Sequence, residues 1–161
     1  MNKISVWLVA LVSCLGCLSV HAAQLTAGDA VPPISAKDQH GTNFTLTTNV
    51  QYLLVVTEKS AAKSANQKLV EQGAGYLEKH RAMYLMDIHT MPTVGRWFAF
   101  PKLKKYPHRI ILVDSADALA KFPTQPGCVT VVKLTPVGRV ERIRYWNPTK
   151  EPASVCFEQK P

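Results

Sequence analysis

Two pairs of cysteines are the residues of this 161-residue chain whose type and spacing point most directly to chemistry. Cys14 and Cys17 form a C-x-x-C pattern, which is typical of redox and metal sites. The pattern lies inside a mostly apolar run over 4–20, which follows the positive charge of Lys3 and precedes the small-residue spacing of 20–22. These are the features of a cleavable secretory signal, so we expect residues 1–22 to be a signal peptide that is removed together with this pair.

Lipidation is a competing interpretation of the same N-terminal segment. The stretch 11–14 ends in a small residue and Cys14, as a lipoprotein site does, but cleavage there would leave an unusually short apolar region. The sequence contains no second apolar stretch that is long enough to span a bilayer. We therefore expect a mature domain of residues 23–161 that is soluble and either periplasmic or otherwise secreted.

Cys128 and Cys156 are the two cysteines of this mature domain. In an oxidising compartment such a pair tends to form a disulfide, and closing their 28-residue separation would stabilise the fold by roughly 3 kcal/mol. A structural Cys128–Cys156 bridge is therefore the first expectation. Two free or buried thiols and a reactive pair remain as alternatives, because the sequence does not fix the distance between the two residues.

A second pattern with chemical meaning is Ser60-x-x-Lys63 at the start of a predicted helix. It matches a serine nucleophile paired with a lysine base, but enzymes with this motif also use Ser-Asp-Asn and Lys-Thr-Gly elements, which this sequence lacks. We therefore expect Ser60 and Ser64 to cap the helix and Lys63 to be solvated. Ser60 and Lys63 remain weak catalytic candidates.

Asp87 and His89 follow a predicted strand at the sheet edge where ligands of α/β proteins gather. They could form an acid–base or metal pair, but a metal site needs three or four donors, and no H-x-x-x-H or E-x-x-H spacing supplies the others. Asp87 is more simply a loop cap, and His108 stands beside a basic cluster. The sequence has no glycine-rich dinucleotide motif and no P-loop, so we expect neither a metal nor a cofactor.

The mature domain is basic. Lys3 is the one charged residue of the predicted signal, which leaves 18 basic and 11 acidic side chains. The basic excess is concentrated in two groups, Arg96, Lys102, Lys104, Lys105 and Arg109, followed by Arg139, Arg142 and Arg144. This charge favours solubility first and contact with an anionic surface or an envelope protein second. Base-stacking aromatics do not alternate with the basic residues, so we expect no nucleic-acid partner.

Hydrophobic patterning predicts an α/β domain, and no internal repeat or long linker divides it. A continuous apolar run predicts a central strand covered on both faces, and helical and extended patterns then alternate along the chain. The expected order is a strand over 52–57, a helix over 64–80, a strand over 83–86, a helix over 93–100, a turn over 101–107, a strand over 109–113, a helical turn over 116–121 and a hairpin over 129–146. Two parallel strands with crossover helices and an antiparallel hairpin give a mixed sheet between helices.

The order of these elements and their turns resembles a known family. The segments 28–32, 38–41 and 44–46 look like the opening hairpin of extracytoplasmic thioredoxin-like proteins of the TlpA and peroxiredoxin type. Tyr106-Pro107 before a strand that ends at Asp114, and the turn 137–140, are similar as well. The resemblance implies a thioredoxin-like mixed β-sheet flanked by helices, with an N-terminal β-hairpin extension.

The same resemblance exposes a departure at the catalytic loop. In that family the loop after the first central strand carries a reactive cysteine at a helix N-terminus, where the helix dipole favours the thiolate. The equivalent segment here, 57–64, contains no sulfur, so thiol–disulfide exchange and peroxidase chemistry cannot start from it. Cys128 follows Pro126, which stands near the position of the family's cis-proline, and this placement would bring Cys128 near Ser60.

We therefore expect a thioredoxin-like protein that lacks redox activity and serves as a binding or accessory module of the cell envelope. The alternative is an atypical thiol–disulfide or peroxide-related oxidoreductase that uses Cys128, with or without Cys156.

Overall fold

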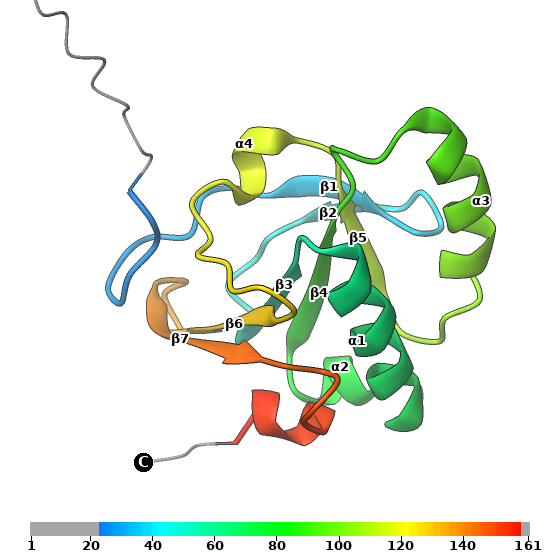
Figure 1. Cartoon of the computed structure of the whole chain (residues 1–161). Coiled ribbons are helices and arrows are strands. Elements are labelled where there is room, and N and C mark those ends of the chain that lie inside the picture. Colours follow the sequence, from blue (N-terminus) through cyan, green and yellow to red (C-terminus); the bar gives the residue numbers. More distant parts are fainter. Residues whose placement is uncertain (1–22, 159–161) are drawn as a thin grey trace, which may run out of the picture.

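The computed structural model describes residues 23–158, so the predicted signal peptide, residues 1–22, lies outside the described residues. Within this range a seven-stranded sheet has the strand order β2-β1-β5-β4-β3-β6-β7, with helices on both faces (Figure 1). The strands are β1 (Ser35–Asp38), β2 (Asn43–Thr45), β3 (Tyr52–Val56), β4 (Ala82–Asp87), β5 (Ile110–Val113), β6 (Val129–Leu134) and β7 (Val140–Trp146). The helices are α1 (Lys59–Glu71), α2 (Tyr76–Lys79), α3 (Thr93–Leu103), α4 (Ala116–Leu119) and the short 3-10 helix η1 (Ala153–Cys156).

The centre of the sheet is parallel. Strand β4 pairs in parallel with β3 on one side and with β5 on the other. Every residue of β3 and β5 is buried, as their continuous apolar runs predict for strands covered on both faces. The sequence pattern predicted two parallel strands, whereas the structure has three, β3, β4 and β5. The third arises because the crossover through α3 returns the chain to β5 in the same direction as β4.

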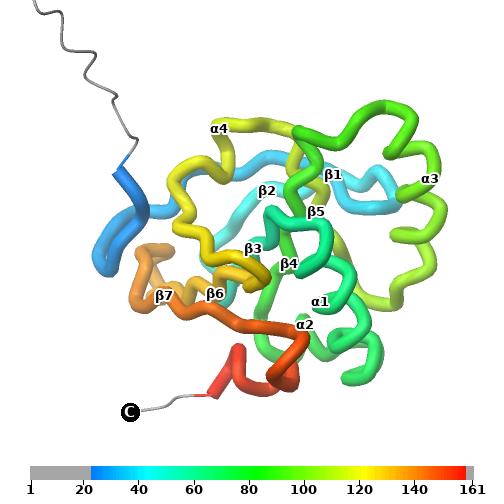
Figure 2. Tube along the Cα trace, in the orientation of Figure 1, coloured from blue at the N-terminus to red at the C-terminus, as the bar shows by residue number. Residues whose placement is uncertain are grey.

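An antiparallel hairpin lies at each edge of this parallel centre, as the chain trace shows (Figure 2). On one side β6 pairs with β3, and β7 pairs with β6 in a register that places Val129 opposite Trp146. On the other side β1 pairs with β5, with Lys37 opposite Leu112, and β2 pairs with β1. The sheet is therefore mixed, as the sequence predicts.

Alternate residues of the strands point into two separate cores. Tyr52, Leu54 and Val56 of β3 pack in the core under α1, α2, α3 and η1, whereas Leu53 and Val55 pack in the core under α4 and the N-terminal segment. This alternation follows from the two-residue period of a strand. Because both faces are covered, the loops at the ends of the central strands remain as the places where side chains can meet a ligand.

Two helices differ from their predicted bounds. The helix expected over 64–80 begins at Lys59 and is interrupted between α1 and α2, where Gly73 and Gly75 have φ values of +85° and +79°. Such values favour glycine and end a right-handed helix. The helix expected to stop before Pro101 continues through it to Leu103, with Pro101 exposed inside the helix. Among the described residues, no helix has the length and apolar character needed to cross a bilayer.

Candidate functional site

The carboxyl ends of β3 and β4 and the start of α1 enclose a cleft of about 340 Å³. This is the sheet edge at which parallel α/β proteins bind their ligands. We call it the sheet-edge cleft. Its lining is mostly apolar with a few polar side chains; the lining residues are Val56, Thr57, Glu58, Lys59, Ala62, Met86, Asp87, Thr90, Met91, Pro92, Gly95 and Ala99. The segment that the family resemblance matches to the catalytic loop therefore forms one wall of a cavity.

Ser60 and Lys63 do not point to acyl-transfer chemistry in this structure. Both side chains are exposed, neither lines the sheet-edge cleft, and the described part of the chain shows no hydrogen bond between them. The predicted capping role of Ser60 and Ser64 is wrong, because Ala62 already donates its backbone N–H to the carbonyl of Glu58. This bond makes Glu58 the N-cap, and its side chain makes no cap hydrogen bond.

The carboxylate of Glu58 instead joins the start of α1 to the loop before β6. Its Oε2 accepts a hydrogen bond from the backbone N–H of Gly127 at 2.9 Å. Gly127 has a φ of +70°, which turns this N–H toward α1 and favours glycine at the position. The loop of 126–128 thus lies beside the start of α1, where the resemblance places it. All peptide bonds of residues 23–158 are trans, so Pro126 is not a cis-proline.

The predicted Cys128–Cys156 disulfide is wrong in this structure: both cysteines are free. Cys128 lies just before β6, beyond the level at which Thr130 pairs with Val55 near the end of β3. Cys156 is in η1, next to Phe157, whose ring is 5.1 Å from that of Tyr52 at the opposite end of β3.

This placement explains why no bridge forms. Tyr52 and Val55 are roughly 10 Å apart along the strand, and Cys128 lies two residues farther out. A disulfide requires Cα atoms within about 7 Å. Cys156 is 2% exposed, and its burial raises the pKa of its thiol far above the ordinary value, so it is not a nucleophile. Cys128 is half-buried and is the accessible thiol of the two.

We expect thiol titration to report this difference. In the folded protein, a disulfide-exchange reagent should react quickly with Cys128 and slowly with buried Cys156. After denaturation without reductant, both thiols should react, and a Cys128→Ser variant should lose the fast phase alone. Recovery of neither thiol from the denatured, unreduced protein would contradict the structure and restore the bridge.

Asp87, which lines the sheet-edge cleft, forms a compact pair with His89. The Oδ1 atom of Asp87 accepts the backbone N–H of His89 at 3.0 Å and lies 2.6 Å from its ring Nδ1. Asp87 is therefore a loop cap, as expected, and it also orients an imidazole whose other nitrogen is available. Among residues 23–158 there is no group of three or more acidic, histidine or cysteine side chains that could hold a metal ion.

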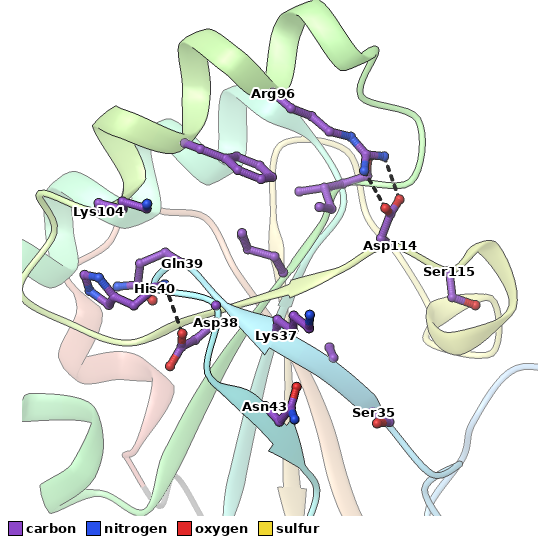
Figure 3. A pocket seen from close by; sticks show the side chains of 15 residues that line it. Ser35, Lys37, Asp38, Gln39, His40, Asn43, Arg96, Lys104, Asp114 and Ser115 are labelled. Atoms are coloured by element: carbon purple, nitrogen blue, oxygen red, sulfur yellow. Dashed lines mark hydrogen bonds and ion pairs between the residues drawn. The ribbon is translucent and has the colours of Figure 1, made fainter.

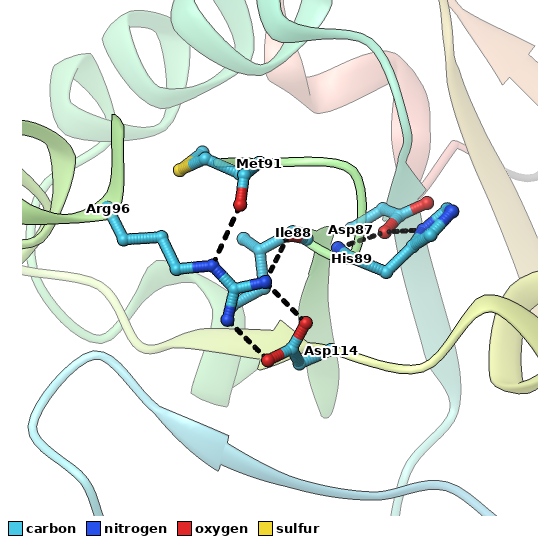
Figure 4. Close-up of polar contacts among 6 residues, drawn as sticks. All are labelled: Asp87, Ile88, His89, Met91, Arg96 and Asp114. Atoms are coloured by element: carbon cyan, nitrogen blue, oxygen red, sulfur yellow. Dashed lines mark hydrogen bonds and ion pairs between the residues drawn. The ribbon is translucent and has the colours of Figure 1, made fainter. Parts of the chain in front are cut away.

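Arg96 of α3 forms structural hydrogen bonds, although the sequence placed it only in a group of basic residues. Its Nε and Nη2 atoms donate to the carbonyls of Met91 and Ile88 at 3.0 Å, and both terminal nitrogens bind the carboxylate of Asp114 (Figure 4). The hydrogen bonds to Arg96 hold the pKa of Asp114 below its ordinary value. This network ties α3 and the loop after β4 to the end of β5.

A second cavity, of about 550 Å³, lies between the β1–β2 hairpin, α3 and the end of β5 (Figure 3). Ile88, Phe100 and Leu112 form part of its apolar lining, and Lys37 and Lys104 stand among its polar residues. Two other lining residues form structural contacts. Asp38 binds the hairpin turn and Arg109, and Arg96 binds Asp114. This cavity could not be predicted from the sequence, because its residues come from three distant segments.

The fold agrees with that of solved thioredoxin-like proteins. A peroxiredoxin-like protein from Aquifex aeolicus matches with a TM-score of 0.56 at 14% identity, over 84% of this chain and 86% of that one. The thioredoxin domain of a thiol-disulfide oxidoreductase from Bacteroides vulgatus matches with a TM-score of 0.51 at 15% identity, over 78% of this chain and 93% of that one. No protein-family model and no curated protein matches the sequence. At these identities the likeness establishes the thioredoxin-like fold.

Proposed function

We propose that this chain, which has a thioredoxin-like fold, is an exported binding or accessory module of the cell envelope that carries out no thiol redox chemistry. The observation that supports this most directly is the state of the catalytic-loop segment. Residues 57–64 contain no cysteine, and the single acidic side chain of this segment, Glu58, accepts a hydrogen bond from the backbone N–H of Gly127. The two loops that would flank a reactive thiol in a redox enzyme are here joined by a structural contact.

The sheet-edge cleft is the site that a ligand would use. Its apolar residues include Val56, Met86 and Met91, and Thr57 and Asp87 are among its polar residues. Apolar walls with a few convergent polar groups are typical of ligand sites in proteins. Methionine side chains are flexible and polarisable, so they adapt to varied apolar ligands. A segment of a partner protein with an apolar side chain fits this description.

Redox assays test the first half of this proposal. We expect the protein to show no reduction of insulin disulfides and no consumption of peroxide with added dithiol above a Cys128→Ser, Cys156→Ser double variant. The reason is that both reactions need a thiolate at the active loop, and 57–64 has none. Turnover clearly above the double variant would show that the chain is an atypical redox enzyme.

That outcome would favour a second candidate, an oxidoreductase that uses Cys128. The observation in its support is that Cys128 is partly accessible and adjacent to Gly127, which contacts the start of α1. The observation against it is the distance to Cys156, which leaves Cys128 without a resolving thiol. A single thiol of this kind would support mixed-disulfide exchange at most.

Capture from envelope extracts tests the binding half with the same protein. Ala99 lines the sheet-edge cleft and is half-buried, so Ala99→Leu narrows the cavity. Ala116 is exposed at the start of α4, and Ala116→Leu is the matched control. A partner retained by wild type and by Ala116→Leu, but lost with Ala99→Leu, would support the cleft as the binding site. Equal retention by all three proteins would place the partner elsewhere.

A further inference from the structure

The outer face of α3 is unusually apolar for a solvent-facing helix. Val94, Trp97 and Phe98 are 64%, 75% and 72% exposed, and Pro101 is exposed next to them. These four residues follow the spacing i, i+3, i+4, i+7, which places them on one side of the helix. We call them the α3 outer face. Exposed apolar patches of this kind mark interaction sites rather than ordinary surface.

Two residues on the inner side of the same helix, Arg96 and Leu103, attach it to the fold. Arg96 binds two backbone carbonyls and Asp114, and Leu103 is buried in the core. Gly95 and Ala99 face the sheet-edge cleft. The α3 outer face is therefore carried by a helix that Arg96 and Leu103 attach to the rest of the fold.

The charge around the α3 outer face is positive. No aspartate or glutamate occurs between Asp87 and Asp114. Of the basic residues in this stretch, Arg96 and Arg109 are paired with Asp114 and Asp38. The remaining three, Lys102, Lys104 and Lys105, are exposed, and within residues 23–158 they form no ion pair. An apolar, aromatic face thus adjoins three uncompensated positive charges.

We propose that the α3 outer face and these three lysines bind the surface of an anionic phospholipid bilayer. Tryptophan and phenylalanine insert at the level of the headgroups, and lysine side chains beside them reach the lipid phosphates. Lysine is depleted in protein–protein interfaces, so this combination favours lipid over a protein partner. A second copy of the chain would bring the same positive charges together, which disfavours self-association at this face.

Binding to vesicles tests this proposal, and the chain contains its own reporter. Of the two tryptophans in the described residues, Trp97 is 75% exposed and Trp146 is 1% exposed, so insertion changes the surroundings of Trp97. The third tryptophan of the chain, Trp7, is common to wild type and variants, so the signal of Trp97 is the difference between wild type and Trp97→Phe. With vesicles of mixed phosphatidylglycerol and phosphatidylcholine, we expect co-sedimentation and a blue shift of the tryptophan emission that a Trp97→Phe variant lacks. Pure phosphatidylcholine vesicles should bind the protein far more weakly, and added salt should weaken binding to the anionic vesicles.

Charge variants in the same full-length background give the quantitative arm. Neutralising Lys102, Lys104 and Lys105 to glutamine should lower the partition coefficient on the order of 100-fold, because each lysine near an anionic surface contributes about fivefold. Three exposed lysines on other elements, Lys79, Lys121 and Lys150, provide a matched control of equal charge loss. Any contribution of residues 1–22 is common to all these proteins and cancels in the comparison.

The α3 outer face is tested separately with Trp97→Ser, Phe98→Ser, which alters exposed side chains and leaves the core intact. We expect this variant to lose vesicle binding while its circular dichroism and thermal unfolding remain those of wild type. Equal binding by the two triple-lysine variants, or equal binding to neutral and anionic vesicles, would overturn the proposal. So would a concentration-dependent dimer that Trp97→Ser, Phe98→Ser abolishes, because the face would then bind a second copy.

Discussion

Replacement of Asp38 by alanine is expected to lower the free energy of unfolding by about 3 kcal/mol. Its side chain is 7% exposed, and both carboxylate oxygens are used. Oδ1 accepts the backbone N–H groups of His40 and Thr42 at 2.9 Å, which closes the β1–β2 turn, and Oδ2 binds Nε of Arg109 at 2.9 Å. Alanine would leave two backbone donors and one guanidinium without their partner.

The conservative variant Asp38→Asn separates the two roles of this side chain. Its amide oxygen still accepts the two backbone N–H groups, but the ion pair with Arg109 is lost. Because the Arg109 side chain is 34% exposed and can be solvated, we expect a cost of about 1 kcal/mol. Urea unfolding followed by circular dichroism measures both variants. Equal losses for alanine and asparagine would show that the ion pair, rather than the turn, carries the stability.

The same contacts explain the ionisation of Asp38. Desolvation by burial acts to raise its pKa, but the hydrogen bonds from Thr42 and His40 and the nearby Arg109 outweigh it, and the pKa lies below the ordinary value of 3.8. Asp38 is thus charged at neutral pH and joins the hairpin turn to the start of the segment that leads into β5. Loss of this side chain is expected to loosen the β1–β2 hairpin, which lines the cavity of about 550 Å³, more than it affects the sheet-edge cleft.

The central sheet could be predicted from the sequence because its signals are local. The run of Tyr52–Val56 is continuous and apolar, so its identity as a buried strand does not depend on any distant residue. The hairpin of β6 and β7 likewise carries its turn between two extended runs. In both cases the residues that determine the element are the residues within it.

The start of α1 and the state of the cysteines could not be predicted, because they depend on contacts between distant segments. Glu58 is held by Gly127, 69 positions away, and this contact has no signature near either residue. Oxidising surroundings favoured a Cys128–Cys156 bridge, but the path of the tail along the sheet places Cys156 beside Phe157 and the start of β3. An oxidising compartment favours disulfide formation between cysteines, but the fold determines the distance between Cys128 and Cys156.

His108 shows the same limit for a titratable group. The sequence places His108 beside a basic cluster, with no pattern that predicts burial, yet it is 1% exposed. Its Nε2 donates to Oδ1 of Asn66 at 2.8 Å, and Asn66 in turn donates to the carbonyl of Ala62 in α1. The rings of Tyr84 and Tyr106 lie 5.9 and 5.4 Å from the imidazole. Its Nδ1 atom is buried and has no hydrogen-bond partner in the described structure.

Burial lowers the pKa of His108 to about 4, from an ordinary value of 6.5. Between these two values the unfolded chain binds a proton at this residue and the folded protein does not. The free energy of unfolding should therefore fall as the pH is lowered from about 6.5 to about 4, by about 3 kcal/mol from this residue. Above pH 6.5 both states are neutral at this position, and the effect vanishes.

A His108→Gln variant isolates this contribution. Glutamine can donate to Asn66 but does not titrate, so the free-energy difference between wild type and variant should shift by about 3 kcal/mol against wild type as the pH falls through this window. The comparison with the variant is needed because burial also lowers the pKa of His80. That shift changes the free energy of unfolding of both proteins in the same direction and cancels in their difference. Urea unfolding at a series of pH values gives the two profiles. Parallel profiles would mean that His108 is protonated in the folded protein, with its Nδ1 proton satisfied by a partner other than those described.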